Sequence, residues 1–356
     1  MNRLRPTVSS SLVATGAAVL TVVCVVVFTA RDPARTLGTF LYGPLANRYA
    51  LGNFLSQAGM LALTGAGVVV AFRSGVFNLG GEGQVYVAAL VTTLILTSTP
   101  IPVIPAVLIG SAVPAVIAGT SGWLRHRTGA DELITSFLLS AALIPLVDYL
   151  IVGPFRDQET NLLATKSIPE YARLTRLLSP STLTTAVFWA IGVVILLWFV
   201  LHWTLPGYEL RIVGYNRRLA RYAGIPVGLY TTLSMTVSGF LHGLAGTVLV
   251  LGVHHRSIIG FSGGLGWNGI AVALIARNRP VLLVPAALFF AFLNAGARAA
   301  VLQNQTTWEL GSLIQAVVFL FVTADILHKH RPRRGRPLRD RLRGGLSRQG
   351  KDGNTV

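Results

Sequence analysis

Long apolar stretches, almost free of charged side chains, recur along most of the chain. An α-helix needs about 20 apolar residues to cross ~30 Å of hydrocarbon. In lipid, backbone N–H and C=O groups must find partners within the protein, which leaves helices or a closed barrel as the spanning structures. The alternating segments of about ten residues that build a barrel do not occur in this sequence. The pattern therefore predicts an all-α integral membrane protein.

About ten transmembrane helices are expected from the length of these stretches and their lack of charge. They lie at 12–30, 51–71, 81–99, 102–124, 131–151, 181–203, 227–252, 262–276, 280–300 and 309–327. The first follows Arg3 and Arg5, as a signal peptide would. It is too long for such a signal and no cleavage site follows it, so we expect it to be retained. Residues 1–327 thus form one transmembrane domain.

Charge is sparse and unevenly placed. Of the 356 residues 12% are charged and 52% hydrophobic, yet the net charge is +17. Ten basic and two acidic residues fall in 328–356, which is predicted to be a disordered cytoplasmic tail attracted to anionic membrane lipids. No aromatic residue is interleaved with its arginines, so we expect no nucleic-acid partner. The positive-inside rule places both termini in the cytoplasm and 152–180 outside.

Several kinds of chemistry have no support in the sequence. Cys24 is the single cysteine, so neither a disulfide framework nor a thiolate metal site can form. The glycine-rich phosphate loop of ATPases is missing, as is the paired-histidine zinc motif. His254 and His255 are interpreted as interfacial residues. We therefore expect no catalytic residue, no cofactor and no metal site in this chain.

Two glycine-rich polar segments interrupt the apolar pattern: RSGVFNLGGEGQ at 73–84 and GFSGGLGWNGI at 260–270. Broken helices at membrane depth are tolerated only where they pack in protein or line a cavity. Interrupted segments in corresponding halves of a chain point to a transporter's binding path. In the expected topology the two breaks run in opposite senses, which favours an inverted repeat of five plus five spans. The segments should then approach each other, unless they are two ordinary glycine-rich turns.

Glu82 is the most informative single residue, because a carboxylate within a span is costly and usually faces a cavity or a partner. It could accept a hydrogen bond from a ligand. It could equally cap the N-terminus of the third span, where negative charge is favoured. The candidate residues beside a central substrate path are Phe77, Asn78, Glu82, Gln84, Trp267 and Asn268.

A second informative segment is the polar loop 205–227. Residues 215–223 are expected to form a short helix, with Arg217, Arg218 and Arg221 on its polar faces. Gly224 and, two residues later, a proline form a stop signal. An arginine-rich helix between spans on the cytoplasmic side is either a membrane-surface helix or a docking element for a soluble partner.

Three motifs in order resemble a known family. RSGVFNLGGEGQ, GYNRRLARYAGI and GWNGIAVALIARNRP are similar to membrane subunits of bacterial ABC importers of the branched-chain amino acid and simple-sugar permease superfamily. The form of the first motif resembles the nucleoside (BmpA-type) importer permeases. The resemblance covers roughly 50–327. It implies a type II importer permease in the bacterial cytoplasmic membrane. Its implied partners are a homologous second permease, cytoplasmic ABC ATPases and an extracytoplasmic substrate-binding lipoprotein.

The resemblance also implies residue roles. It gives the segment at about 215–223 the role of the coupling helix, which docks on the ATPase. The residues concerned are Asn216, Arg217, Ala220, Arg221, Tyr222 and Gly224. We expect Tyr222 and the alanines to be buried in the ATPase, and Arg217 and Arg218 to lie at the rim of that contact. Arg217, Arg218 and Asn268 depart from the family's usual residues, which leaves a substrate contact at Asn268 open.

The function indicated by the resemblance is that of the permease subunit of an ATP-driven importer, with ATP hydrolysed by the partner. Nucleosides are the expected substrate. Riboflavin, a free purine or a simple sugar are alternatives within the same class. A stand-alone secondary transporter or channel is the alternative of a different class, and it would not need the cytoplasmic helix at 215–223.

Overall fold

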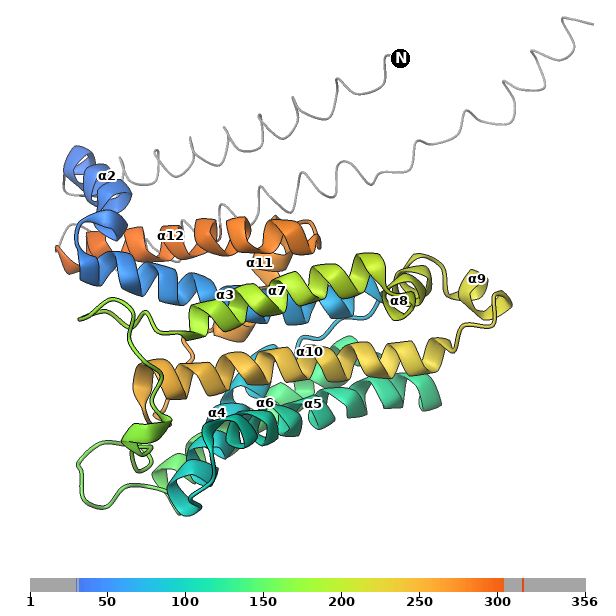
Figure 1. Cartoon of the computed structure of the whole chain (residues 1–356), viewed down its shortest axis with the longest axis horizontal. Helices are drawn as coiled ribbons and strands as arrows, with labels where there is room; N and C mark the ends of the chain where they lie inside the picture. The colour runs from blue at the N-terminus through green and yellow to red at the C-terminus, as the bar shows by residue number, and fades with distance from the viewer. Residues whose placement is uncertain (1–29, 31, 304–315, 317–356) are drawn as a thin grey trace, which may run out of the picture.

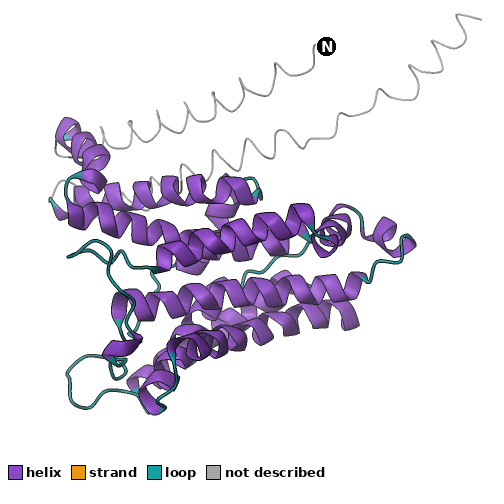
Figure 2. Cartoon of the chain, viewed as in Figure 1, coloured by secondary structure: helices purple, strands orange, loops and turns teal. Residues whose placement is uncertain are grey.

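The computed structural model describes residues 30, 32–303 and 316, and these residues form helices and loops with no β-strand (Figure 2). The spans expected at 12–30 and 309–327 and the tail at 328–356 lie, apart from residues 30 and 316, outside the described part of the chain. The count of ten helices therefore stays a prediction.

Eleven α-helices are labelled in chain order within the described residues. They are α2 (Pro33–Tyr42), α3 (Arg48–Arg73), α4 (Gly81–Ser98), α5 (Val103–Thr128), α6 (Glu132–Val152), α7 (Ala186–Trp203), α8 (Leu205–Tyr215), α9 (Arg217–Tyr222), α10 (Val227–Leu249), α11 (Leu265–Ile275) and α12 (Leu283–Leu302). A π turn at Val250–His254 continues α10, and short 3₁₀ turns lie at Gly43–Leu45, Glu170–Ala172 and Pro280–Leu282.

Six helices are long and apolar enough to cross a membrane. They are α3, α5, α6, α7, α10 with its π turn, and α12 with the preceding 3₁₀ turn. Each corresponds to one of the expected spans. The stretches expected at 81–99 and 262–276 are the shorter helices α4 and α11, of 18 and 11 residues. Together these helices form a multi-pass bundle.

The long helices run side by side with α10 at the centre (Figure 1). In this view α3, α7 and α12 lie on one side of α10, and α4, α5 and α6 lie on the other. Three glycines of α10 permit this close packing. A Cβ added to Gly239 would lie 2.5 Å from a backbone oxygen of α5. One added to Gly243 would lie 2.6 Å from the Pro114 ring, and one added to Gly246 would lie 2.2 Å from the Val85 oxygen of α4. Small residues at such positions let helix backbones approach in membranes.

The two ends of the bundle differ in charge and in connections. α8 and α9 lie at one end, and the long segment 152–180 lies at the other, beside the C-terminal end of α10 (Figure 1). The α8–α9 end carries Arg73, Arg125, Arg127, Arg211, Arg217, Arg218, Arg221, Arg277 and Arg279, with Asp131, Glu132 and Glu209. The positive-inside rule predicts that this end faces the cytoplasm.

Candidate functional site

The segment 74–80 turns back into the bundle after α3 ends at the cytoplasmic side. Gly75 makes the turn with φ +71°, a conformation that favours glycine. At Gly81, the first residue of α4, the His242 ring is within 2.5 Å of the position of a Cβ, and the same ring adjoins Gly67 of α3. Gly67 lies six residues before the end of α3, or about 9 Å at 1.5 Å per residue. α4 therefore begins inside the bundle.

A polar stripe on α6 supplies hydrogen-bond partners for this re-entrant segment. The stripe consists of Glu132, Ser136 and Ser140. These residues recur every four positions, so they share one helix face, and all three are buried. The three contacts are Phe77 N–H to Glu132 Oε1 at 3.1 Å, Leu79 N–H to Ser136 Oγ at 3.1 Å and Gly83 N–H to Ser140 Oγ at 2.8 Å. Because an unsatisfied backbone group in lipid costs several kcal/mol, this stripe stabilises the re-entrant backbone and the first turn of α4 at membrane depth.

The amides of Asn78 and Gln84 hold the shape of the turn. Asn78 Nδ2 donates to Gln84 Oε1 at 2.9 Å and Gln84 Nε2 donates to Asn78 Oδ1 at 3.0 Å. Asn78 also bonds the Gly80 N–H and the Ser238 hydroxyl of α10. Both side chains are buried, and their amide groups are hydrogen-bonded to other atoms of the protein.

The second glycine-rich segment re-enters from the opposite end. After the π turn, residues 255–264 run along α4, from Ser257 beside Thr93 to Phe261, whose ring lies 4.7 Å from the ring of Tyr86. α11 then begins at Leu265, preceded by Gly264 with φ +79°. A Cβ on Gly266 would lie 2.3 Å from the Glu82 backbone nitrogen. The starts of α4 and α11 therefore meet, which confirms the prediction that the two segments approach each other.

Glu82 joins the two short helices. Its carboxylate accepts the Gly266 N–H at 2.7 Å, the Gly264 N–H at 3.2 Å and the hydroxyl of Ser262. Helix N-termini carry partial positive charge and unpaired N–H groups. One carboxylate thus sits in the first turn of α4 and caps the start of α11. The prediction that Glu82 caps a helix is correct in kind, but the helix whose N–H groups it accepts is α11.

Three partly exposed aromatic rings lie on the elements that border this junction. Trp267 of α11 is 37% exposed, Phe77 of the re-entrant segment 44% and Phe137 of α6 43%. The Trp267 and Phe137 ring centroids are 5.9 Å apart. The side chain of Asn268, next to Trp267, is partly exposed and makes no hydrogen bond within the described residues. Of the predicted path residues, Phe77, Trp267 and Asn268 are the ones with free surface.

The cytoplasmic element at 205–226 is two helices, where a single helix over 215–223 was expected. Asn216 breaks it, and its side chain accepts the N–H groups of Arg218 and Leu219, which caps α9. Gly224, with φ +76°, ends α9 in a Schellman motif, since the Ile225 N–H bonds the carbonyl of the residue five positions before it. A short polar residue that caps a new helix explains the break.

The faces of α9 differ from expectation at two residues. Ala220 is fully buried against its own chain, so it is not available to a partner. Contact with its own chain was not expected for Arg217, which turns toward the bundle so that its Nη2 donates to the Gly75 carbonyl at 3.3 Å. Its place in a partner contact stays a prediction. Burial lowers the pKa of Arg217, and the nearby Arg221 adds to this effect. Tyr222, by contrast, is 91% exposed.

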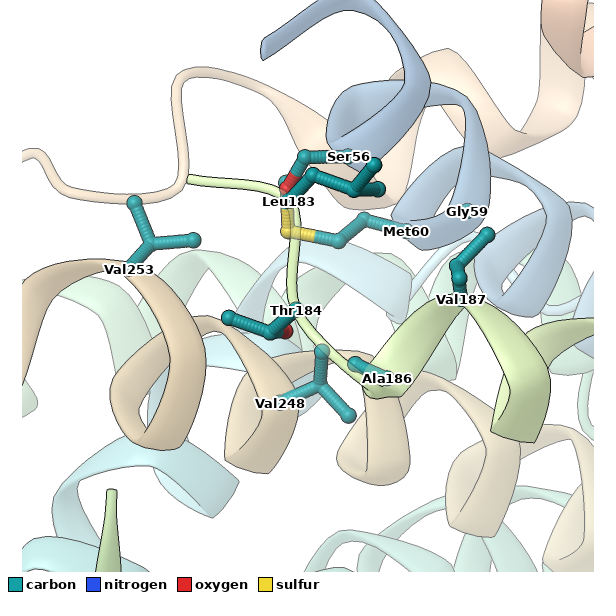
Figure 3. Close-up of a pocket in the computed structure, with 9 residues that line it drawn as sticks. All are labelled: Ser56, Gly59, Met60, Leu183, Thr184, Ala186, Val187, Val248 and Val253. Carbon is teal, nitrogen blue, oxygen red and sulfur yellow. The ribbon is translucent and has the colours of Figure 1, made fainter. Parts of the chain in front are cut away.

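The described residues contain a small pocket but no cluster of metal-ligating side chains. A small pocket lies between α3, the start of α7 and α10, lined by Ser56, Met60, Thr184, Val187 and Val248 among others (Figure 3). Its volume of about 10 Å³ is no larger than a single water needs. The described part of the chain holds no group of three His, Cys, Asp or Glu residues that could bind a metal.

Sequence reasoning missed Phe137, Ser262 and the polar stripe of α6. A signal for the stripe was present, because Glu132, Ser136 and Ser140 recur every four residues in an otherwise apolar span. Such a row is typical of one helix face that contacts polar groups. Nothing in the sequence indicated that the polar groups would be the backbone of 77–83.

Comparison with known proteins identifies the family. A family model described as "Branched-chain amino acid transport system / permease component" matches residues 50–323. The chain belongs to this permease family. The probable riboflavin import permease protein RfuC of Treponema pallidum is 34% identical to the permease, over 84% of this chain and 81% of that protein. The guanosine ABC transporter permease protein NupP of Bacillus subtilis is 30% identical, over 78% and 81%.

A third relative, the glucose ABC transporter permease protein TsgB13 of Haloferax volcanii, is 29% identical over 84% of this chain and 83% of its own length. The predicted resemblance to the superfamily and to its nucleoside group is confirmed. The permease is a multi-pass protein of the plasma membrane and a translocation subunit of an ABC importer. A permease of this kind works with ATPase and binding-protein partners.

Proposed function

We propose that the permease moves nucleosides inward as one of two homologous permease subunits of a type II ABC importer. Two cytoplasmic ATPases hydrolyse ATP, and an external lipoprotein delivers the substrate. The guanosine permease NupP and the nucleoside permease NupB of Lactococcus lactis, 27% identical over 80% of this chain, support a nucleoside. Riboflavin is the second candidate, because the probable riboflavin import permease RfuC is 34% identical.

The observation that carries the proposal is the junction of α4 and α11, with exposed aromatic rings beside it. Guanosine and riboflavin share a fused heteroaromatic ring system that carries a hydroxylated five-carbon group, a ribose ring in guanosine and an open chain in riboflavin. Such rings stack on aromatic side chains, and Trp267, Phe77 and Phe137 offer partly exposed faces. Asn268 adds an amide for ring donors and acceptors. Asn78, Glu82 and Gln84 then stabilise the segments that line the path and do not contact substrate, since their polar groups are already bonded within the protein.

The antiparallel starts of α4 and α11 support an inverted repeat. α4 leaves the junction toward the outer end and α11 leaves it toward the cytoplasmic end, and each follows a glycine-rich re-entrant segment. We propose that the helices at 12–30 and 309–327 complete ten spans in two groups of five. The junction would then lie on the axis that relates the two halves, as binding sites do in transporters built this way.

The ATPase is proposed to dock on α8 and α9. Tyr215 ends α8, and Leu219 and Tyr222 lie three residues apart on α9; they are 86%, 49% and 91% exposed. Large exposed apolar side chains at the arginine-rich end of the bundle indicate an interaction surface. Aromatic anchors in such surfaces contribute most of the binding energy.

Transport by the full complex tests the proposal. The permease, its second permease, the ATPase and the lipoprotein are reconstituted in liposomes, and uptake of labelled guanosine, riboflavin and glucose is compared. We expect ATP-driven uptake of guanosine, and loss of that uptake in Trp267→Ala. Phe188→Ala, on an exposed face of α7, is the matched control and should transport like the parent. Uptake of riboflavin alone would favour the second candidate, and uptake of glucose alone would overturn both.

A further inference from the structure

The cytoplasmic helices touch the re-entrant segment directly. Gly214, near the end of α8, lies so close to the end of α3 that a Cβ there would be 2.0 Å from the Arg73 carbonyl oxygen. The Arg217 guanidinium, at the start of α9, donates to the Gly75 carbonyl. The backbone of the turn at 73–75 is therefore held by the element that faces the cytoplasm.

The same turn leads to the junction in a few residues. Six positions separate Gly75 from Gly81, where α4 begins. Along this path Phe77 is bonded to Glu132, which forms an ion pair with Arg125. The segment is short, and it is hydrogen-bonded to Arg217 at Gly75 and to Glu132 at Phe77. A displacement of Gly75 should therefore also displace Glu82.

A separate contact fixes α8 to the spans. The Tyr230 hydroxyl of α10 donates to Glu209 Oε2 of α8 at 2.5 Å. The cytoplasmic element therefore has one polar tie to a long helix and another to the re-entrant segment. The tie through Arg217 is the one that leads to the proposed substrate path.

We infer that Arg217 is a positioning residue that transmits movement of α8 and α9 to the re-entrant segment 74–80, and through it to Glu82 and the start of α11. This inference rests on the proposed docking of the ATPase at α8 and α9. Arginine suits the role because its guanidinium stays charged and presents several donors in a fixed geometry. Arg218, its neighbour, has an exposed side chain and provides the matched control.

The first test measures substrate molecules transported per ATP hydrolysed by the complete complex in liposomes. For Arg217→Ala we expect ATPase recruitment to be kept and this ratio to fall roughly tenfold, within the range for residues that couple distant sites. Arg217→Lys, which also donates to a carbonyl, should recover part of the ratio. Arg218→Ala should match the parent. An unchanged ratio in Arg217→Ala, or a loss of recruitment that accounts for the whole defect, would overturn the inference.

A second measurement works without a known substrate. In a Cys24→Ser background, Phe77→Cys is labelled with a thiol reagent in the complex, with and without ATP. We expect ATP to change the labelling rate when Arg217 is present and not in Arg217→Ala. An equal ATP response in both refutes the inference. Absence of uptake of every substrate tested by the parent complex, with the ATP response intact, would instead count against the proposed substrate.

Discussion

Glu82 accepts the backbone N–H of Gly266 at 2.7 Å across 184 residues of sequence. One carboxylate thereby ties the start of α4 to the start of α11 in the interior of the bundle. Without a capping acceptor, the N-terminus of α11 would leave N–H groups unpaired at that depth, so this bond stabilises both broken segments at once.

A substitution at Glu82 distinguishes a structural role of its carboxylate from a role in binding the substrate. In Glu82→Gln one amide oxygen remains as acceptor, while the amide NH₂ faces backbone N–H donors. We expect the permease to lose about 1–3 kcal/mol of stability, the usual cost of a buried unsatisfied group, measured as a lower unfolding temperature in detergent. Transport should fall in proportion to the folded fraction. Full stability with no transport would mean that the carboxylate acts on the substrate.

Gly266→Ala tests the close approach of the two helix starts. Its Cβ would lie 2.3 Å from the Glu82 nitrogen and 2.4 Å from the Gly81 carbonyl carbon, and backbone atoms have little room to move. We expect a loss of about 3 kcal/mol or more, at the upper end for overpacking. Gly192→Ala is the control, because nothing lies within 4 Å of its Cβ position. Equal unfolding temperatures for the two variants would contradict the described junction.

The stripe on α6 makes a third prediction. Ser136→Ala leaves the Leu79 N–H of the re-entrant segment without its acceptor, and Ser140→Ala does the same for the Gly83 N–H in the first turn of α4. Each change should cost about 1–3 kcal/mol, read as a shift in thermal unfolding. Thr120→Ala on α5, whose exposed hydroxyl bonds only its own helix, should shift it much less. A larger shift for Thr120→Ala would show that the stripe does not carry the segment.

The exposed face of α9 predicts how the ATPase binds. Tyr222→Ala should weaken ATPase recruitment to membranes by about 2 kcal/mol or more, roughly thirtyfold, as for a central aromatic anchor. Membrane insertion should be unaffected because the side chain contacts little of its own chain. Arg217→Ala should leave recruitment intact. Recruitment that depends on Arg217 and not on Tyr222 would reverse the assignment of the two faces.

Much of the fold followed from the sequence, because length and lack of charge alone identify helices in lipid. The spans expected at 51–71, 102–124 and 131–151 match α3, α5 and α6 within a few residues at most ends. The span expected at 181–203 begins late, at Ala186. The reason is tertiary, since Asn53 of α3 binds the backbone and hydroxyl of Thr182 and holds this stretch outside the helix.

The site was predicted less completely. Glycine content indicated that 73–84 and 260–270 would meet, but the capping partner of Glu82 depends on how α11 is placed. The burial of Ala220 and the inward turn of Arg217 likewise depend on contacts with the bundle that no local pattern encodes. The break at Asn216 could have been predicted from the sequence, because Asn is a favoured N-cap residue.

ATP-driven uptake by the reconstituted complex tests the central claim most directly. Liposomes that contain the permease with its second permease, its ATPase and its lipoprotein are loaded with ATP, and internal labelled guanosine is measured against time. The account predicts accumulation that needs ATP, all partner subunits and Trp267. Accumulation by the permease alone without ATP, or the same ATP-driven rate for Trp267→Ala as for Phe188→Ala, would contradict it.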